Sequence, residues 1–355
     1  MYTSQQKEFR KSSFFSPVSS LVQEQYIMAA VKKYKASVSD VILIYPSNTA
    51  PFKIGTRPIP SPEDDQLLVK VMSAALNPCD VLAQQAFLAV LGIDIAGLVG
   101  KTGTKLGEFF VGDKVFFQGH FFDSSQTGYQ QHTVVLSELV SYIPSNLSFD
   151  QDSSIPLTFV IAFVGLFHST RLQIAPPFAG PAVTAANVII LVIGGSSIVG
   201  SSPSNSQPSL KRILTTVASK HNSTVKAVGA IHVFDRAAAD LEEQIRVATT
   251  DELVYIYDAV SSEDMQDLSW KLLPDTKPRT LVLIRDSVQT DASPKKTQNR
   301  SGHWHRGVSV LLWKAIGKWL EEGVVVPPKM TVLGGLAAVP KGVQRRREGK
   351  VSGGS

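Results

Sequence analysis

The sequence predicts an α/β protein built from two domains. Its first half carries short strand-like runs separated by turns rich in glycine and proline, and the character of the chain changes near Pro156. Beyond that point apolar strand-like runs alternate with helical patterns, which predicts a parallel sheet covered by helices on both faces. The length of 355 residues fits two domains of ordinary size.

Short apolar and alternating runs in the first half predict a compact, mainly β domain. In the run from Leu67 to Leu76 apolar and polar residues alternate, which is typical of a strand with one buried face. The proline-rich stretch GTRPIPSPEDD, residues 55–65, is expected to be a surface connection. The expected strands are VILIY, LLVKVMSAAL, VLGIDIAGLVG and VGDKVFFQG.

The second half shows the alternation of a parallel α/β unit. PLTFVIAFVGLFHST, from Pro156, is long and apolar enough for a buried helix, and DRAAADLEEQIRVAT predicts a second helix between strands. A further helix is expected in VSVLLWKAIGKWLEEG, where Leu312, Ile316 and Trp319 recur at helical spacing. The expected strands are NVIILVIGG, RILTTVAS, AIHVFD, VYIYDAV and TLVLIRD.

Cysteine content and apolar run lengths narrow the class of protein. Cys79 is the one cysteine of the sequence, so a disulfide within the chain and a zinc site with several thiolates are both excluded. A reducing compartment and a cytoplasmic location are expected. The longest apolar runs fall short of the ~18 residues that span a bilayer. Residues 1–27 are expected to be a disordered leader.

The net charge of +5 and the pI near 9.1 do not indicate a nucleic-acid-binding protein. Much of the excess positive charge lies in SPKKTQNR and KGVQRRREGK, without the interleaved aromatic residues that stack on bases. A basic surface also suits a ligand that carries phosphate groups, and an acidic protein partner would be attracted to it as well.

A glycine-rich turn follows the strand VIILVI and indicates a dinucleotide site. Gly194, Gly195 and Gly200 bracket four residues, with Ser197 where the G-x-G-x-x-G pattern has its middle glycine. In such a site the glycines allow a tight turn and a close approach of the backbone to the pyrophosphate. The alternative is an ordinary loop with no ligand.

The end of the next strand favours NADP over NAD. An NAD site usually places Asp or Glu there to bind the ribose 2′-hydroxyl group. This chain instead has Ser219, Lys220, His221 and Asn222, which suit a 2′-phosphate. The alternative is that Lys220 is a solvated surface lysine.

The segment after the glycine turn departs from the apolar helix expected there. SSPSNSQPSLKR, residues 201–212, contains Pro203 and Pro208. A proline in the interior of a helix costs about 3 kcal/mol, and serine and asparagine add to this through poor helix propensity. The sequence therefore predicts a distorted helix, or a short one that begins late.

A series of segments carries a resemblance to a known family. In chain order they are AALNPCD, VLGIDIAGLVG, VGDKVF, GYQQH, IGGSSIVG, TTVASKHN, VGAIHVFD, LWKAIGKWLEEG and GVQRRREGKVSG. With these segments the chain resembles the medium-chain dehydrogenase/reductase superfamily. It is most similar to the zinc-independent branch of quinone oxidoreductases and of trans-acting enoyl reductases that partner fungal polyketide synthases in secondary metabolism.

The resemblance implies a fold with a Rossmann-type parallel sheet domain and a GroES-like mainly-β domain. The GroES-like catalytic domain is expected over residues 28–160 and the Rossmann NADP-binding domain over 161–300. Residues 301–355 are expected to return to the catalytic domain. The cofactor implied is NADPH.

The resemblance also implies roles for particular residues. Ser196, Ser197, Ile198 and Val199 would lie along the pyrophosphate with Gly194, Gly195 and Gly200, and Ser219, Lys220 and Asn222 would hold the adenosine 2′-phosphate end. Asn77 and Asp80 would line the cleft near the nicotinamide, and Tyr129 would belong to the strand motif that closes it. These last three are the catalytic candidates. Each also has a purely structural alternative: Asn77 as part of an Asn-Pro turn, Asp80 as the cap of the next helix and Tyr129 as a packed aromatic ring.

Zinc is not expected in the site. Zinc-using relatives carry a cysteine near the position of Asn77 to Asp80 and a Gly-His-Glu motif where this chain has Gly92, Ile93 and Asp94. Cys79 alone cannot build a zinc site of the usual kind. The hydride of the reaction would come from the cofactor, and Tyr129, a backbone amide or water could supply the proton.

The function that the sequence indicates is an NADPH-dependent enoyl reductase that acts on the C=C bond of an α,β-unsaturated carbonyl. The substrate would be a small molecule or a carrier-bound enoyl group, with a synthase as a possible partner, and the chain would act as a monomer or homodimer. The alternatives are a quinone or enal reductase and a weakened, non-catalytic accessory member. The last alternative rests on the disrupted helix and on Ile161, where many relatives have threonine.

Overall fold

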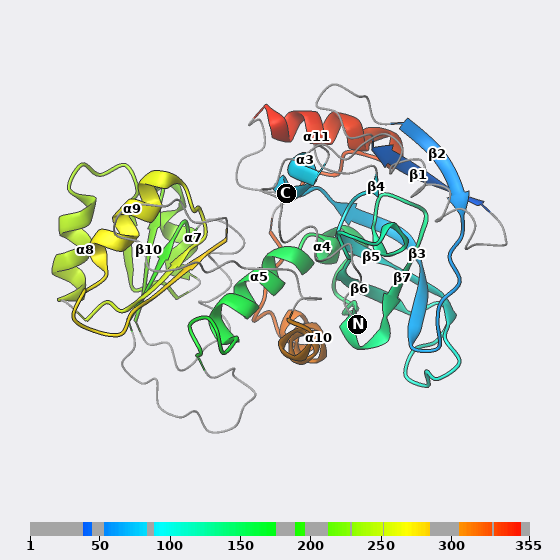
Figure 1. Cartoon of the computed structure of the whole chain (residues 1–355), viewed down its shortest axis with the longest axis horizontal. Helices are drawn as coiled ribbons and strands as arrows, with labels where there is room; N and C mark the ends of the chain where they lie inside the picture. The colour runs from blue at the N-terminus through cyan, green and yellow to red at the C-terminus, as the bar shows by residue number, and fades with distance from the viewer. Residues whose placement is uncertain are drawn as a thin grey trace. The chain divides into compact units, whose positions relative to one another are not determined.

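The structure is a computed structural model that describes most of the chain between Val38 and Glu348 and divides it into two units (Figure 1). Unit 1 comprises Met1–Pro156 and Pro328–Ser355, and unit 2 comprises Leu157–Pro327. The expected leader, residues 1–27, lies outside the described residues. The described ranges are 38–44 (backbone only), 53–83, 89–174, 189–195, 212–227, 229–250, 252–284, 305–328 and 330–348.

Unit 1 is built on antiparallel sheets, as the alternating runs predicted. Its five-stranded sheet has the order β7-β3-β5-β6-β8, and a three-stranded sheet has the order β2-β1-β4. Leu67 and Val69 of β3 and Ile95 of β5 are fully buried. The strands are β1 (Val38–Ile44), β2 (Lys53–Pro58), β3 (Gln66–Ala75), β4 (Ala89–Val90), β5 (Asp94–Thr102), β6 (Lys114–Gln118), β7 (His132–Leu136) and β8 (Val140–Tyr142).

One strand of unit 1 lies where the sequence predicted a surface connection. Residues 55–58 belong to β2, which pairs antiparallel with β1 from Val38 opposite Pro58 to Leu43 opposite Lys53. The expectation for this part of GTRPIPSPEDD was wrong. β2 is at the edge of its sheet and Pro58 is its last residue, which are positions where a strand tolerates a proline.

Short helices complete unit 1. α4 begins with a capping box, in which Ser148 and Gln151 satisfy each other's backbone N–H groups. α11 contacts α3. Gly342 of α11 lies close to Leu76, just before α3, because a Cβ atom on Gly342 would lie 2.2 Å from Cδ1 of Leu76. The helices are α3 (Pro78–Ala83), α4 (Phe149–Ser153) and α11 (Val339–Arg347), with 3₁₀ turns η1 (Ser124–Gln126), η2 (Ser137–Leu139) and η5 (Leu336–Ala338).

Unit 2 contains the predicted parallel sheet, with the strand order β11-β10-β9-β12-β13. Every residue of β9 is buried, which explains why its sequence is continuously apolar rather than alternating. The order reverses at β9, because β10 pairs on one side of it and β12 on the other. The strands are β9 (Ile189–Ile193), β10 (Arg212–Val217), β11 (His232–Asp235), β12 (Tyr255–Asp258) and β13 (Thr280–Leu283).

The helices of unit 2 confirm the alternating pattern with one shift. α8 begins at Leu241, later than the run from Asp235 suggested, because Asp235 accepts the N–H of Ala237 in a turn and Asp240 becomes the N-cap residue. The helices are α5 (Pro156–Phe167, whose first residue ends unit 1), α7 (Asn222–Ala227, after the 3₁₀ turn η3, Ser219–His221), α8 (Leu241–Thr249), α9 (Glu263–Leu272) and α10 (Arg306–Glu321).

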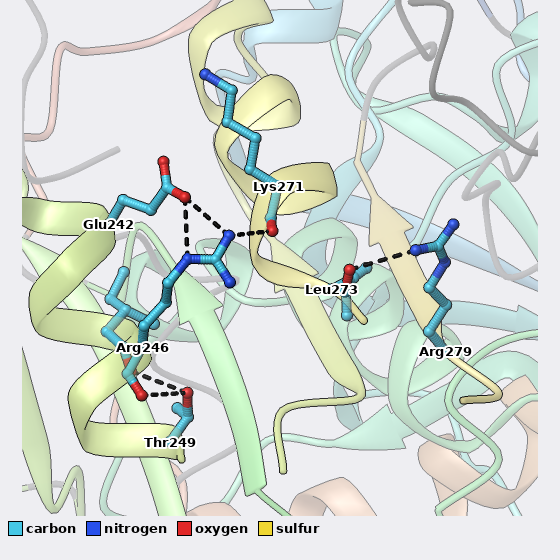
Figure 2. Close-up of polar contacts among 7 residues, drawn as sticks. Glu242, Arg246, Thr249, Lys271, Leu273 and Arg279 are labelled. Atoms are coloured by element: carbon cyan, nitrogen blue, oxygen red, sulfur yellow. Dashed lines mark hydrogen bonds and ion pairs between the residues drawn. The ribbon is translucent and has the colours of Figure 1, made fainter. Parts of the chain in front are cut away.

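Two arginines bind the carbonyl groups at the C-terminal end of α9 (Figure 2). Arg246 of α8 is held by Glu242 at 2.8 and 3.0 Å and donates to the carbonyl oxygen of Lys271. Arg279 donates to the carbonyl oxygen of Leu273 at 3.2 Å (Figure 2). The last carbonyl groups of a helix have no partner inside it, so these contacts fix α8 and β13 against the end of α9.

α10 belongs to unit 2, which differs from the expected return of the chain at residue 301. The ring of Trp319 lies 6.3 Å from the rings of Phe159 and Phe163 of α5. Unit 2 extends to Pro327, and the chain returns to unit 1 at Pro328. In the part of the chain that the structure describes, no helix is long and apolar enough to span a membrane.

Candidate functional site

The described part of the glycine turn leaves the end of the central strand β9. The N–H groups of Gly194 and Gly195 both donate to the carbonyl oxygen of Thr216, at 3.1 and 3.2 Å. Gly194 has a φ of +81°, and a Cβ atom there would lie 2.5 Å from Cγ2 of Val260. A Cβ atom on Gly195 would lie 2.0 Å from Oγ1 of Thr215. Both positions therefore require glycine, for conformation at the first and for space at both.

The rest of the predicted pyrophosphate site is outside the described residues. Ser196, Ser197, Ile198, Val199 and Gly200 fall there, together with the segment for which a distorted or late helix was predicted. Their roles remain predictions.

The residues predicted for the 2′-phosphate follow β10 directly, at the carboxyl end of the sheet. Ser219 and Lys220 lie in η3 and are exposed, and Asn222 is the first residue of α7. Ser219 Oγ donates to Oδ2 of Asp235, the last residue of β11. Lys220 forms no salt bridge within the described ranges. Its charge is available to an anionic ligand at the edge where open α/β sheets bind ligands.

The three catalytic candidates form one buried cluster in unit 1. Oδ2 of Asp80 accepts the backbone N–H of Asn77 and the hydroxyl group of Tyr129, each at 2.7 Å. The side-chain amide of Asn77 donates to Oδ2 of Asp94 at 2.9 Å. All four residues are less than 5% exposed. The cluster thus joins the loop before α3, the start of β5 and the segment before β7.

Gly92 explains how the ring of Tyr129 reaches Asp80. Gly92 has a φ of +88°, and a Cβ atom there would lie 2.6 Å from Cδ1 of Tyr129. The backbone N–H of Gly128 donates to the carbonyl oxygen of Gly92 at 2.7 Å, which fixes the two segments together. The ring therefore lies next to the backbone of Gly92, and its hydroxyl group donates to the carboxylate of Asp80.

Burial dominates the electrostatics of this cluster. Loss of solvent raises the pKa of Asp80 from 3.8 to about 6. The hydrogen bonds from the Asn77 N–H and from Tyr129 and the charge of Arg346 act in the opposite direction and lower this pKa. Burial and the neighbouring Asp80 raise the pKa of Tyr129 well above its ordinary value. The backbone of Gly92 also lowers the pKa of Asp80, but burial is the larger effect, so the carboxyl group can take up a proton near pH 6.

Replacing Tyr129 by phenylalanine tests this coupling. The variant Tyr129→Phe leaves a buried carboxylate without one of its donors, so the free energy of unfolding should fall by about 1–3 kcal/mol at pH 7.5. The loss should be smaller at pH 4.5, where Asp80 is protonated and no longer needs the donor. Urea unfolding at the two pH values measures it. Tyr142→Phe is the matched control, because Tyr142 bonds the Glu108 carbonyl group at the surface; an equal loss at both pH values for Tyr129→Phe would contradict the coupling.

Sequence reasoning missed two acidic residues of these sites, Asp94 and Asp235. Asp94 was noted only as a departure from a metal motif, yet it binds Asn77 across 17 positions of chain. Asp235 lies at the end of the predicted strand AIHVFD, and Ser219 lies at the end of the predicted strand RILTTVAS. The pairing of these two strands in the sheet was the signal that could have indicated Asp235. Among the described residues, no group of three or more His, Cys, Asp or Glu side chains is placed to hold a metal ion.

Comparisons with known proteins agree with this architecture. Residues 63–144 match the family model of the alcohol dehydrogenase GroES-like domain. The chain is 30% identical over 274 residues to "Dehydrogenase pigH" of Monascus ruber, an alignment that covers 68% of this chain and 74% of that protein. It is 31% identical over 236 residues to "Trans-enoyl reductase tndF" of Aspergillus flavipes, covering 61% of this chain and 65% of that protein.

A solved structure with the same fold is the quinone oxidoreductase of Pseudomonas syringae pv. Tomato DC3000. It superposes with a TM-score of 0.68 at 18% identity, over 89% of this chain and 98% of that chain. At this level of identity the likeness shows the fold, which combines a GroES-like domain with a Rossmann-type domain.

Proposed function

Because the chain belongs to the medium-chain dehydrogenase/reductase superfamily, a family of oxidoreductases that use a nicotinamide cofactor, we propose that it is an NADPH-dependent enoyl reductase. In this proposal the reaction reduces the C=C bond of an α,β-unsaturated carbonyl, without zinc. A curated relative bears the name trans-enoyl reductase, which supports a carrier-bound substrate and a synthase partner.

The observation that carries the proposal is the geometry at the carboxyl end of β9. The sheet order reverses there, and the chain turns through two glycines that no larger residue can replace. Open α/β sheets bind dinucleotides at such a switch point. Lys220 at the end of β10 adds a positive charge that suits the 2′-phosphate of NADPH. The residues present therefore fit the cofactor.

The cofactor and the side chains have separate roles in the proposed reaction. The cofactor, when bound, supplies the hydride. Gly194 and Gly195 allow the backbone to approach the pyrophosphate, and Lys220 binds the phosphate on the adenosine ribose. In unit 1, Tyr129 is the proton donor of the proposal, and Asp80 is the carboxyl group that holds a proton next to the Tyr129 hydroxyl group.

The hydrogen bond between Tyr129 and Asp80 decides when Tyr129 can donate. While Asp80 is ionised, the hydroxyl proton of Tyr129 is directed to the carboxylate. When Asp80 takes up a proton, its O–H can donate to the Tyr129 oxygen. The tyrosine hydroxyl proton, which also lies within hydrogen-bond distance of the Ala75 carbonyl oxygen at 3.3 Å, can then pass to the substrate carbon. Asn77 positions Asp80 through its backbone N–H.

Consumption of NADPH with two kinds of acceptor tests the function. An enoyl thioester such as crotonyl-coenzyme A should be reduced, and a small quinone such as 1,4-benzoquinone should be reduced much more slowly. The opposite preference would support a quinone reductase, whose fold this chain shares. No turnover with either acceptor by the folded protein would support an accessory member without catalysis.

Lys220→Ala tests the cofactor assignment. Loss of a charge-assisted contact to phosphate should weaken NADPH binding about tenfold and NADH binding less than twofold. Fluorescence titration measures both. Lys226→Ala is the matched control, because Lys226 is also exposed and lies in the last turn of the next helix, α7. An equal loss for the two cofactors would contradict a role at the 2′-phosphate.

A further inference from the structure

A second cation lies beside the proposed phosphate site. Arg236 follows β11 directly, and its backbone N–H donates to the carbonyl oxygen of Val217, the last residue of β10, at 2.9 Å. Lys220 lies three residues beyond Val217 in the chain. Both side chains are exposed, and neither forms a salt bridge among the residues that the structure describes. Two positively charged residues thus follow the carboxyl ends of neighbouring strands.

Asp235 connects the two segments that carry these cations. Its Oδ2 accepts the hydroxyl group of Ser219, and its Oδ1 accepts the N–H of Ala237 at 2.9 Å. These hydrogen bonds, that of Ser219 first, lower the pKa of Asp235, and the charge of Arg236 contributes in the same direction. The carboxylate is therefore ionised at neutral pH, and it fixes the start of the loop that bears Lys220 to the end of β11.

We propose that Arg236 binds the ribose 2′-phosphate together with Lys220, and that Asp235 limits the affinity of the pocket for this phosphate. The inference rests on the proposed function and names a residue that the sequence motifs did not indicate. A phosphate monoester carries close to two negative charges at pH 7. A guanidinium group can donate two parallel hydrogen bonds to its oxygens, and an ammonium group adds a point charge. The carboxylate of Asp235 repels the same phosphate while it orders Ser219.

The test uses two small probes that differ in the 2′-phosphate. Adenosine 2′,5′-bisphosphate and adenosine 5′-monophosphate are titrated into the full-length protein by calorimetry. Arg236→Ala should weaken binding of the bisphosphate about tenfold and binding of the monophosphate less than twofold. Lys314→Ala is the control for the loss of one charge, because Lys314 is exposed on α10, and it should change neither affinity by more than twofold.

Asp235→Asn provides a second, opposite readout. The amide keeps one acceptor oxygen, for the Ala237 N–H, and its NH2 group can donate to Oγ of Ser219. Because the negative charge is removed, the bisphosphate should bind about threefold more tightly. Suppose that the wild type prefers the bisphosphate. If Arg236→Ala then binds the bisphosphate as tightly as the wild type does, or loses the same share of affinity for both probes, the role of Arg236 is wrong and the NADPH assignment stands. If the wild type shows no preference for the bisphosphate, both the inference and the NADPH assignment are wrong.

Discussion

Replacing Asp152 by alanine should change the stability of unit 1 by about 4 kcal/mol more favourably at pH 8 than at pH 4. Asp152 of α4 is fully buried, and neither carboxylate oxygen has a hydrogen-bond partner. Loss of solvent raises its pKa from 3.8 to about 7. Each pKa unit corresponds to about 1.4 kcal/mol, so the difference of about three units gives about 4 kcal/mol.

The sign follows from which state of the protein holds the proton. Between pH 4 and pH 7 the unfolded chain has lost the proton of Asp152, and the folded chain retains it. The free energy of unfolding therefore falls by about 1.4 kcal/mol per pH unit over this window. Asp80, with a pKa of about 6, adds a similar fall between pH 4 and pH 6. Because Asp80 is unchanged in the variant, the difference between wild type and Asp152→Ala isolates Asp152.

Urea unfolding at four pH values from 4 to 8 measures this difference. Asp152→Asn is the matched variant, because it removes the charge and keeps the shape, and it should abolish the same part of the pH dependence. Parallel curves for wild type and Asp152→Ala would show that Asp152 ionises without penalty in the folded protein.

Replacing Gly195 by alanine should weaken NADPH binding by about tenfold to a hundredfold. The new Cβ atom would lie 2.0 Å from Oγ1 of Thr215, a buried residue that donates to the Val192 carbonyl group at 2.8 Å. The turn must then move away from β10, and overpacking of this kind typically costs about 1–3 kcal/mol. A displaced turn no longer presents its backbone to the pyrophosphate in the right position.

A matched glycine and a rescue variant make this prediction specific. Gly307→Ala should leave NADPH binding unchanged, because a Cβ atom there has nothing within 4 Å. Adding Thr215→Ala to Gly195→Ala removes the colliding hydroxyl group and should recover part of the affinity. Equal losses for Gly195→Ala and Gly307→Ala, or no recovery in the double variant, would contradict the packing argument.

The fold of unit 2 could be predicted closely from the sequence. Its strands are short apolar runs between helical patterns, and a residue such as Leu191 in the centre of β9 is buried because both faces of the sheet are covered. Contacts between residues distant in sequence are less visible to such patterns. Unit 2 ends at Pro327, and the ring of Trp319 in α10 lies 6.3 Å from the ring of Phe159 in α5, a contact that no local pattern reveals.

The candidate site could be predicted only as a set of residues. The motifs placed Asn77 and Asp80 in one segment and Tyr129 in another, 49 positions away from Asp80. That the tyrosine donates to the aspartate depends on Gly92 and on the antiparallel sheet around it. The bond between Ser219 and Asp235 depends likewise on the parallel pairing of β10 with β11. Residue types are visible in a sequence, whereas hydrogen-bond partners follow from the topology.

The measurement that tests the central claim most directly is a fluorescence titration of the full-length protein with NADPH and, in parallel, with NADH. The turn at Gly194 and Gly195 and the cations at Lys220 and Arg236 predict saturable binding of NADPH, with affinity at least tenfold higher than for NADH. Absence of NADPH binding by the folded protein, or equal affinity for the two cofactors, would contradict the account of this site.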